Sequence, residues 1–360
     1  MNARMKTLAG VAAILLAAGG AVAEVNIETV PVGNTGNLDD TYGDGYGAVD
    51  YEYNIATYEV TAGQYTEFLN AVGGVDTYVL YITWMWTLTN GCKIERYAGS
   101  GTPVDPYQYR VASDWQDRPV NYVTWGSAAR FANWLHNGQP CGAQDLTTTE
   151  DGAYYLNGAL MDVDLQAVSR EDDWQWAIPT EDEWYKSAYH RNDGDTGNYF
   201  GCPTSSDSAP GYVDQYGNLV TTGDPFTEGG TDPGNYATYT GDLGPGGIGS
   251  PYYRTEVGEW ENSANPYGTF DQGGNVREWT ETIVDGWGRC LRGGSYGNTG
   301  PWLRAWHRTH ITPMGAGSGL GFRLCQVPGP SCVVILALGG VGMLGRRPFD
   351  RTRGKRSVRR

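Results

Sequence analysis

Three short blocks near the C-terminal end decide the fold, and they read GGNVREW at Gly273–Trp279, RGGSY at Arg292–Tyr296 and LGFRLC at Leu320–Cys325. Two longer blocks precede them, RPVNYVTWGSAARFANWL at Arg118–Leu135 and IPTEDEWYKSAYH at Ile178–His190. The chain also contains 53 Gly, 25 Tyr and 13 Trp with only 18% charged residues. This composition predicts a loop-rich globule with an aromatic core, because buried aromatic rings supply much cohesion.

Regular structure is expected to be sparse. A strand is predicted at Tyr51–Tyr58 and a helix after the N-cap Thr61, since Tyr65, Phe68, Leu69 and Val72 recur at helical spacing. Further helices are predicted after Thr124 and after Thr180, where Thr180 and Glu183 form a capping box. Short strands are predicted at Gly288–Arg292 and Gly321–Gln326. Strands and helices do not alternate, so the sequence predicts an α+β fold and not a doubly wound one.

Taken in order from Tyr53 to Cys325, the five blocks resemble the formylglycine-generating enzyme (sulfatase-modifying factor) family. The resemblance implies the formylglycine-generating-enzyme fold, a variant of the C-type-lectin fold. Residues 137–176 are then an insertion between two family blocks, expected to form a surface hairpin or excursion.

The chain departs from the family pattern where the family's chemistry resides. Catalytically active members carry a cysteine pair after GGSY that binds copper, whereas this chain reads GNTGPWLRAWHR and has no cysteine between Cys290 and Cys325. Copper(I) prefers thiolate ligands. Arg277 also stands where the family usually has a Trp that lines the substrate groove. We therefore expect an inherited fold without the known oxidation, and no catalytic residue is assigned.

The N-terminal end is predicted to be a secretory signal peptide. Met1–Lys6 is basic, Leu8–Val22 is apolar, and Ala21-Val22-Ala23 has the small residues of a signal peptidase site. Residues 1–23 are therefore expected to be removed.

The C-terminal end, residues 328–360, is predicted to be a sorting tail. Its apolar run, Cys332–Gly345, is shorter than the roughly 20 residues of a membrane-spanning helix, and arginines follow it. This order resembles the PEP-CTERM tail recognised by exosortase machinery, with Gly329 in place of the usual Glu. A plain C-terminal anchor is the alternative. Residues 24–327 are then an exported domain in the periplasm, outer envelope or on the cell surface, touching membrane only through the tail.

The body between these ends is strongly acidic. Ten of the 25 Lys and Arg and one of the 41 Asp and Glu lie in the two ends, which leaves a body charge near −25. Such a charge repels nucleic acid and anionic lipid, and suits Ca²⁺ and cationic partners. The five body cysteines lack a C-x-x-C motif, so zinc and redox sites are not supported. Export favours one or two disulfides, with Cys290–Cys325 the preferred pair.

Calcium is the expected cofactor. Two carboxylates, Asp271 and Glu278, flank a glycine-containing turn, and Ca²⁺ accepts carboxylate and backbone carbonyl oxygens. The resemblance implies side-chain ligands from Asp271 and Glu278 and carbonyl ligands from Gly274 and Val276. The family's second calcium site corresponds to Asn235, Tyr236 and Asp242. A turn held by side-chain hydrogen bonds is the alternative.

The segment that replaces the cysteine pair is a candidate ligand pocket for sugar or carboxylate. Its residues are aromatic or basic, and with Arg277 they are Trp302, Arg304, Trp306, His307 and Arg308. The alternative is a core strand in which Trp packs inward, the arginines form buried ion pairs, and His307 faces the opposite side. Iron held by His307 and His310 is disfavoured, because iron-dependent relatives use a three-histidine helical domain that this chain lacks.

The expected function is thus a calcium-stabilised, exported binding or structural module, with polysaccharide or a surface protein as possible partners. A non-haem iron or copper oxidoreductase acting on an unknown substrate is the alternative.

Because the cysteine pair is missing, we predict that the protein does not convert a Cys-x-Pro-x-Arg peptide to formylglycine, even with copper supplied. Mass spectrometry of the peptide after incubation measures the conversion. Detectable aldehyde would contradict this prediction.

Overall fold

The computed structural model describes residues 24–42, 45–213, 219–220, 234–241 and 247–328. The chain divides after Pro328 into two units, and the tail unit lies outside the described residues, as do the predicted signal peptide and Asp242. None of the described helices has the length and apolar composition to cross a membrane.

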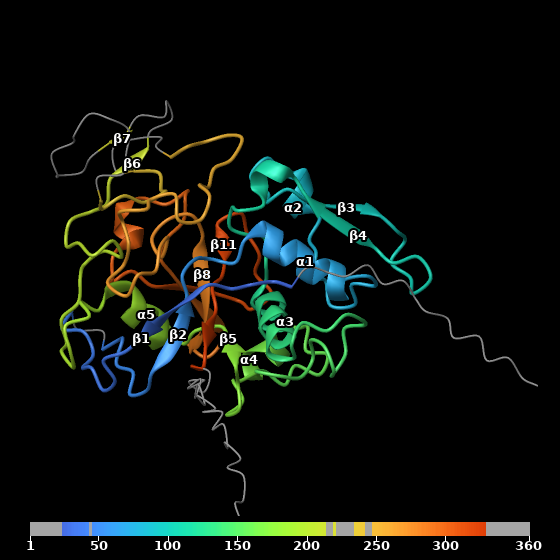
Figure 1. The fold of residues 1–360 in the computed structure, drawn as a ribbon, viewed down its shortest axis with the longest axis horizontal. Helices are drawn as coiled ribbons and strands as arrows, with labels where there is room; N and C mark the ends of the chain where they lie inside the picture. The colour runs from blue at the N-terminus through green and yellow to red at the C-terminus, as the bar shows by residue number, and fades with distance from the viewer. Residues whose placement is uncertain (1–23, 43–44, 214–218, 221–233, 242–246, 329–360) are drawn as a thin grey trace, which may run out of the picture. The chain divides into compact units, whose positions relative to one another are not determined.

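The body contains two four-stranded sheets of short strands, together with helices and long loops (Figure 1). This architecture confirms the predicted loop-rich α+β fold. The first sheet has the strand order β1-β2-β12-β5 and the second β10-β9-β8-β11. All pairings are antiparallel except the one between β8 and β11. The bounds in the first sheet are β1 (Thr29–Val32), β2 (Tyr53–Ala56), β12 (Cys325–Gln326) and β5 (Trp176–Ala177). Those in the second are β10 (Thr309–Ile311), β9 (Gly288–Arg292), β8 (Arg277–Val284) and β11 (Leu320–Gly321).

The three predicted helices are confirmed together with their caps. Thr61 and Gln64 form a capping box at one helix, Thr124 accepts a hydrogen bond from the Ser127 amide at the next, and Thr180 and Glu183 form the predicted box at the third. These helices are α1 (Ala62–Val72), α3 (Trp125–His136) and α5 (Glu181–Tyr189). Two shorter helices are α2 (Trp84–Thr87) and α4 (Asp162–Ala167), and the 3₁₀ turns are η1 (Ser113–Trp115) and η2 (Gly300–Leu303). Two hairpins complete the body, β3 (Ile94–Ala98) with β4 (Gln108–Val111) and β6 (Tyr212–Val213) with β7 (Leu219–Val220).

The main core is aromatic and lies where α1 and α3 meet, the helices that Figure 1 shows next to each other. The ring of Phe131 on α3 lies 5.2 Å from Phe68 and 6.0 Å from Tyr65 on α1, and 5.5 Å from Phe322. Such edge-to-face and offset contacts add stabilisation beyond the area they bury. Phe322 belongs to LGFRLC, so this block connects the core helices to the sheets.

The insertion, residues 137–176, packs against α3 through buried polar groups. Arg130 Nε lies 2.6 Å from the Glu150 carboxylate, and both side chains are buried. Asn133 donates from its amide to the carbonyls of Thr149 and Tyr154, each at 2.8 Å. Leu165 on α4 joins the main core. The insertion thus shares the core of the body instead of standing away from it.

The predicted strand at Gly321–Gln326 is two strands, because the chain crosses there from one sheet to the other. Leu320 and Gly321 pair with β8, whereas Cys325 and Gln326 pair with β2 and β5. Between them, the Arg323 guanidinium lies fully buried. The predicted Cys290–Cys325 disulfide is wrong for the same reason: the two residues lie on strands of different sheets, and both thiols are free.

Arg323 uses all five of its N–H groups at this crossing. It forms a two-pronged ion pair with Glu278, at 2.6 and 2.8 Å. Its remaining donors bind the carbonyls of Ala56, Thr57 and Phe270 at 2.7 to 3.2 Å. One guanidinium therefore joins the end of β2, the start of β8 and the loop before GGNVREW.

We predict that Arg323→Met lowers the free energy of unfolding by about 3 to 5 kcal/mol, because it leaves the buried Glu278 carboxylate without a counter-charge. Urea denaturation measures the loss. As a control, Arg110→Met breaks the exposed Arg110–Glu95 pair and should change stability by less than about 1 kcal/mol. Equal effects of the two substitutions would contradict the central role of Arg323.

Candidate functional site

Of the predicted calcium ligands, Glu278 is the most fully engaged by protein groups. Its carboxylate holds Arg323 and also accepts a hydrogen bond from Trp184 Nε1 at 2.8 Å. The side chain is fully buried. Glu278 therefore has a framework role in this structure, whatever else it binds.

Asp271 sits at the entrance to the turn in the left-handed region, with φ of 60°. Its Oδ2 accepts a hydrogen bond from the Gly258 amide at 2.7 Å. Burial raises the pKa of Asp271 to about 6, although the Gly258 amide and Arg323 favour the charged form. A nearby cation would favour the charged form of a carboxylate in this position and lower its pKa.

Glu59 is the acidic residue that sequence reasoning missed. It is 1% exposed, and neither carboxylate oxygen has a hydrogen-bond partner among the described residues. Burial raises its pKa well above the usual range, and the charges of Asp271 and Glu278 add to the effect. The only signal in the sequence is a carboxylate inside TYEVTAG, between a strand and a capped helix. Its burial depends on distant segments.

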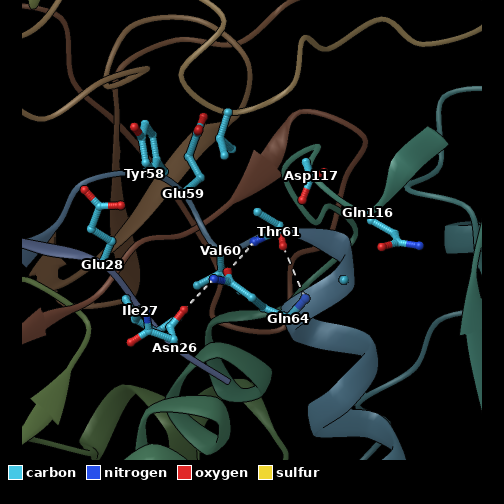
Figure 2. Close-up of a pocket in the computed structure, with 12 residues that line it drawn as sticks. Asn26, Ile27, Glu28, Tyr58, Glu59, Val60, Thr61, Gln64, Gln116 and Asp117 are labelled. Atoms are coloured by element: carbon cyan, nitrogen blue, oxygen red, sulfur yellow. Dashed lines mark hydrogen bonds between the residues drawn. The ribbon is translucent and has the colours of Figure 1, made fainter. Parts of the chain in front are cut away.

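A cavity of about 320 Å³ borders Glu59 and is lined mainly by residues of the segments 26–28 and 58–64, with Gln116 and Asp117 (Figure 2). On one side, Gln64 is hydrogen-bonded both to Thr61 and to the Asn26 carbonyl. Figure 2 shows the Glu59 carboxylate pointing away from that group. Its oxygens are thus not used to build the helix cap beside it.

Glu59 and Asp271 fit a hard cation better than a soft one. In the described part of the chain, no three Asp, Glu, His or Cys side chains converge on one point. A metal held here needs backbone carbonyl oxygens to complete its ligand set, and Ca²⁺ uses them readily. Gly274 and Val276, the predicted carbonyl donors, lie within the turn that Asp271 opens.

The second predicted calcium site is only partly described. The Asn235 side-chain oxygen accepts a hydrogen bond from Thr204 Oγ1 at 2.6 Å, and the Tyr236 amide donates to Ser263 Oγ at 2.8 Å. Asp242 lies outside the described residues. The site stays a prediction.

The candidate pocket residues divide into two groups. Arg308 forms an ion pair with Glu181 at 2.6 Å, as the ion-pair alternative predicted. Arg304 donates to the Asp207 carbonyl at 2.7 Å and lies 5.4 Å from the ring of Trp306, which is 52% exposed. The predicted core strand is wrong over this segment: Pro301 starts η2, and regular pairing begins only at β10.

The second group, Arg277, Trp302 and His307, comes together. The Arg277 guanidinium carbon lies 5.6 Å from the Trp302 ring centroid, and the Trp302 and His307 rings lie 4.2 Å apart. Gly294 of RGGSY makes room for this arrangement, because a Cβ there would lie 3.2 Å from Trp302 and 2.9 Å from Leu303. Its φ of +68° also favours glycine.

Asn298 follows the RGGSY block and bonds back to it. The Asn298 side chain accepts hydrogen bonds from the amide and the hydroxyl of Ser295, at 2.9 and 2.8 Å. These bonds fold the segment back on itself. No sulfur from this segment reaches the site.

The chain is similar to several known proteins. Similar solved structures include Treponema denticola variable protein 1 (20% identity, TM-score 0.46), which covers 86% of this chain and 98% of its own. CarF (21% identity, TM-score 0.47) covers 84% of this chain and 98% of its own. PvdO from Pseudomonas aeruginosa (16% identity, TM-score 0.41) covers 83% of this chain and 92% of its own. No curated protein matches the chain. The model of the sulfatase-modifying factor enzyme 1-like domain matches residues 47–327, which is most of the sequence, and the chain belongs to that family.

Proposed function

We propose that the protein is an exported, calcium-stabilised binding or structural module on a formylglycine-generating-enzyme scaffold, without formylglycine-generating activity. The observation that carries the proposal is Glu59, a buried carboxylate whose two oxygens have no protein partner. A buried carboxylate is destabilising unless it is protonated or neutralised. A calcium ion bound by Glu59 and Asp271, with carbonyls of the turn, would neutralise both.

The position of this site fits a structural role for the ion. Glu59 precedes the α1 cap, and Asp271 precedes β8, so a shared ion would join the helical core to the second sheet. Arg323 already bonds to carbonyls beside both residues, at Thr57 and Phe270. The ion would therefore strengthen an existing junction and leave the exposed loops free to bind a partner.

We predict that Ca²⁺ raises the melting temperature of the mature protein relative to EGTA, and that Glu59→Gln abolishes the rise. At 100 times its dissociation constant, an ion that binds only the folded state adds about 2.7 kcal/mol, or roughly 5 to 10 °C. Glu28→Gln is the matched control, because Glu28 is exposed on the same cavity and should keep the full response. Differential scanning calorimetry measures all three proteins.

The calcium effect should also grow with pH. Without calcium, the raised pKa of Asp271 stabilises the fold below about pH 4, and this contribution is lost as pH rises through about 6. Calcium must displace these protons, so it binds better at pH 8 than at pH 5. An equal shift in melting temperature at the two pH values, or a full response in Glu59→Gln, would refute this calcium site.

Export is the second part of the proposal. It is supported by the basic start, the apolar run and the Ala21-Val22-Ala23 pattern. We expect native protein to begin at Glu24 and to be found outside the cytoplasm, retained through the tail at residues 328–360. Intact-mass analysis of cell fractions tests this, and a cytosolic chain that still begins at Met1 would disprove it.

A further inference from the structure

Arg277 differs from the other buried and half-buried arginines because its side chain has no polar partner among the described residues. Several of the others bind carboxylates: Arg130 binds Glu150, Arg170 binds Glu183, and Arg292 and Arg308 bind Glu181. Arg254, Arg289 and Arg304 bind backbone carbonyls instead. Arg277 has neither an ion pair nor a side-chain hydrogen bond among the described residues, and its Nε is buried without a partner. Burial alone lowers its pKa.

An unpaired arginine is unexpected in a body with a large excess of acidic residues. Carboxylates are abundant, yet none of the described ones approaches Arg277. Arg254 also lacks a carboxylate, but it is fully buried and cannot meet a ligand from solvent. Arg277 is only half-buried, so an anion from outside can reach it. This combination favours a binding site over a framework role.

The neighbours of Arg277 suit a sugar ring. Trp302 is half-buried, with one side engaged by His307 at 4.2 Å between ring centroids. Burial, Arg292 and Arg277 all lower the pKa of His307, so the imidazole is neutral at pH 7. Its Nε2 is buried, so the imidazole packs against Trp302 and is not itself exposed to a ligand from solvent.

The site is held rigid from behind. Arg292, which is fully buried and paired with Glu181, donates from one nitrogen to the carbonyls of Ala305 and His307 at 2.7 and 2.9 Å. Tyr189 donates its hydroxyl to the Leu303 carbonyl at 3.1 Å. These bonds fix the backbone from Leu303 to His307, directly after Trp302. Binding therefore requires little ordering of the protein.

We propose that Arg277 and Trp302 form a binding site for a sugar that carries a carboxylate, a uronic acid residue of a polysaccharide. Arg277 binds the carboxylate through its planar guanidinium and Trp302 covers the sugar ring, while His307 packs against Trp302 and holds it in place. The site gives the proposed binding module its ligand class and rests on that function. A peptide with a free C-terminal carboxylate would satisfy Arg277, but an aliphatic C-terminal residue would bring no ring to lie against Trp302.

Isothermal titration of the mature protein tests the assignment with three probes: a galacturonate oligosaccharide, a neutral galactose oligosaccharide of equal length, and a short peptide with a free C-terminus. We expect only the galacturonate to bind. Arg277→Gln should weaken its binding about 10- to 100-fold, the usual effect of losing a charged hydrogen-bonded pair. Arg277→Lys should weaken it less, since it keeps the charge but loses the planar fork. Arg110→Gln, at an exposed arginine, is the control and should bind normally.

Each outcome decides the proposal. Equal affinity of Arg277→Gln and wild type, equal binding of the neutral sugar, preference for the peptide, or no binding of galacturonate at millimolar concentration would each overturn it. Melting curves establish whether the variants fold. If Arg277→Gln does not fold, the binding test is made with Arg277→Lys. The calcium response is measured on the same samples, so loss of sugar binding with an intact calcium response refutes the ligand site and leaves the module.

Discussion

The ion pair between Arg323 and Glu278 is the interaction on which the rest of the structure depends. It lies where the chain passes from β11 to β12, and thus from one four-stranded sheet to the other. Taking two charges out of water is unfavourable, and only a complete set of partners offsets it. Arg323 has such a set in Glu278 and three backbone carbonyls, while Trp184 binds the other side of Glu278. The sheets, α5 and the turn before β8 are therefore tied to one point.

Most buried charges of the described residues have a partner inside the protein. Arg130, Arg170, Arg292 and Arg323 each pair with a glutamate, and Arg254 and Arg289 bind backbone carbonyls. Among the described residues, Glu59 remains as a carboxylate and Arg277 as a guanidinium with no polar partner for the side chain. They do not compensate each other, because the pKa of Arg277 responds to burial alone. An external cation and an external anion would satisfy them separately, and the calcium and uronate proposals follow from this difference in sign.

Local features of the fold could be predicted from the sequence, and features set by distant segments could not. The N-cap at Thr61 and the capping box at Thr180 were predicted correctly, because a cap depends on residues within three positions of each other. The Cys290–Cys325 disulfide was wrong because strand identity alone does not tell which sheet a strand joins. The predicted strand near Trp302 is a 3₁₀ turn, because Pro301 favours a helical start and Gly294 brings the turn close. Glu59 was missed because nothing beside it in the sequence indicates that its carboxylate is buried unpaired.

The framework charges of this fold lie behind the glycine turns, at Glu278, Arg292 and Arg323, all of them buried. The segment after RGGSY is divided between that framework and the surface. Ala305 is fully buried and its carbonyl accepts a hydrogen bond from Arg292, whereas Trp306 is exposed. Substitutions at the exposed positions change what the surface can bind and leave the buried pairs intact. The proposed recognition site at Arg277 and Trp302 depends on this division, because a ligand can reach these two side chains with no change to the core.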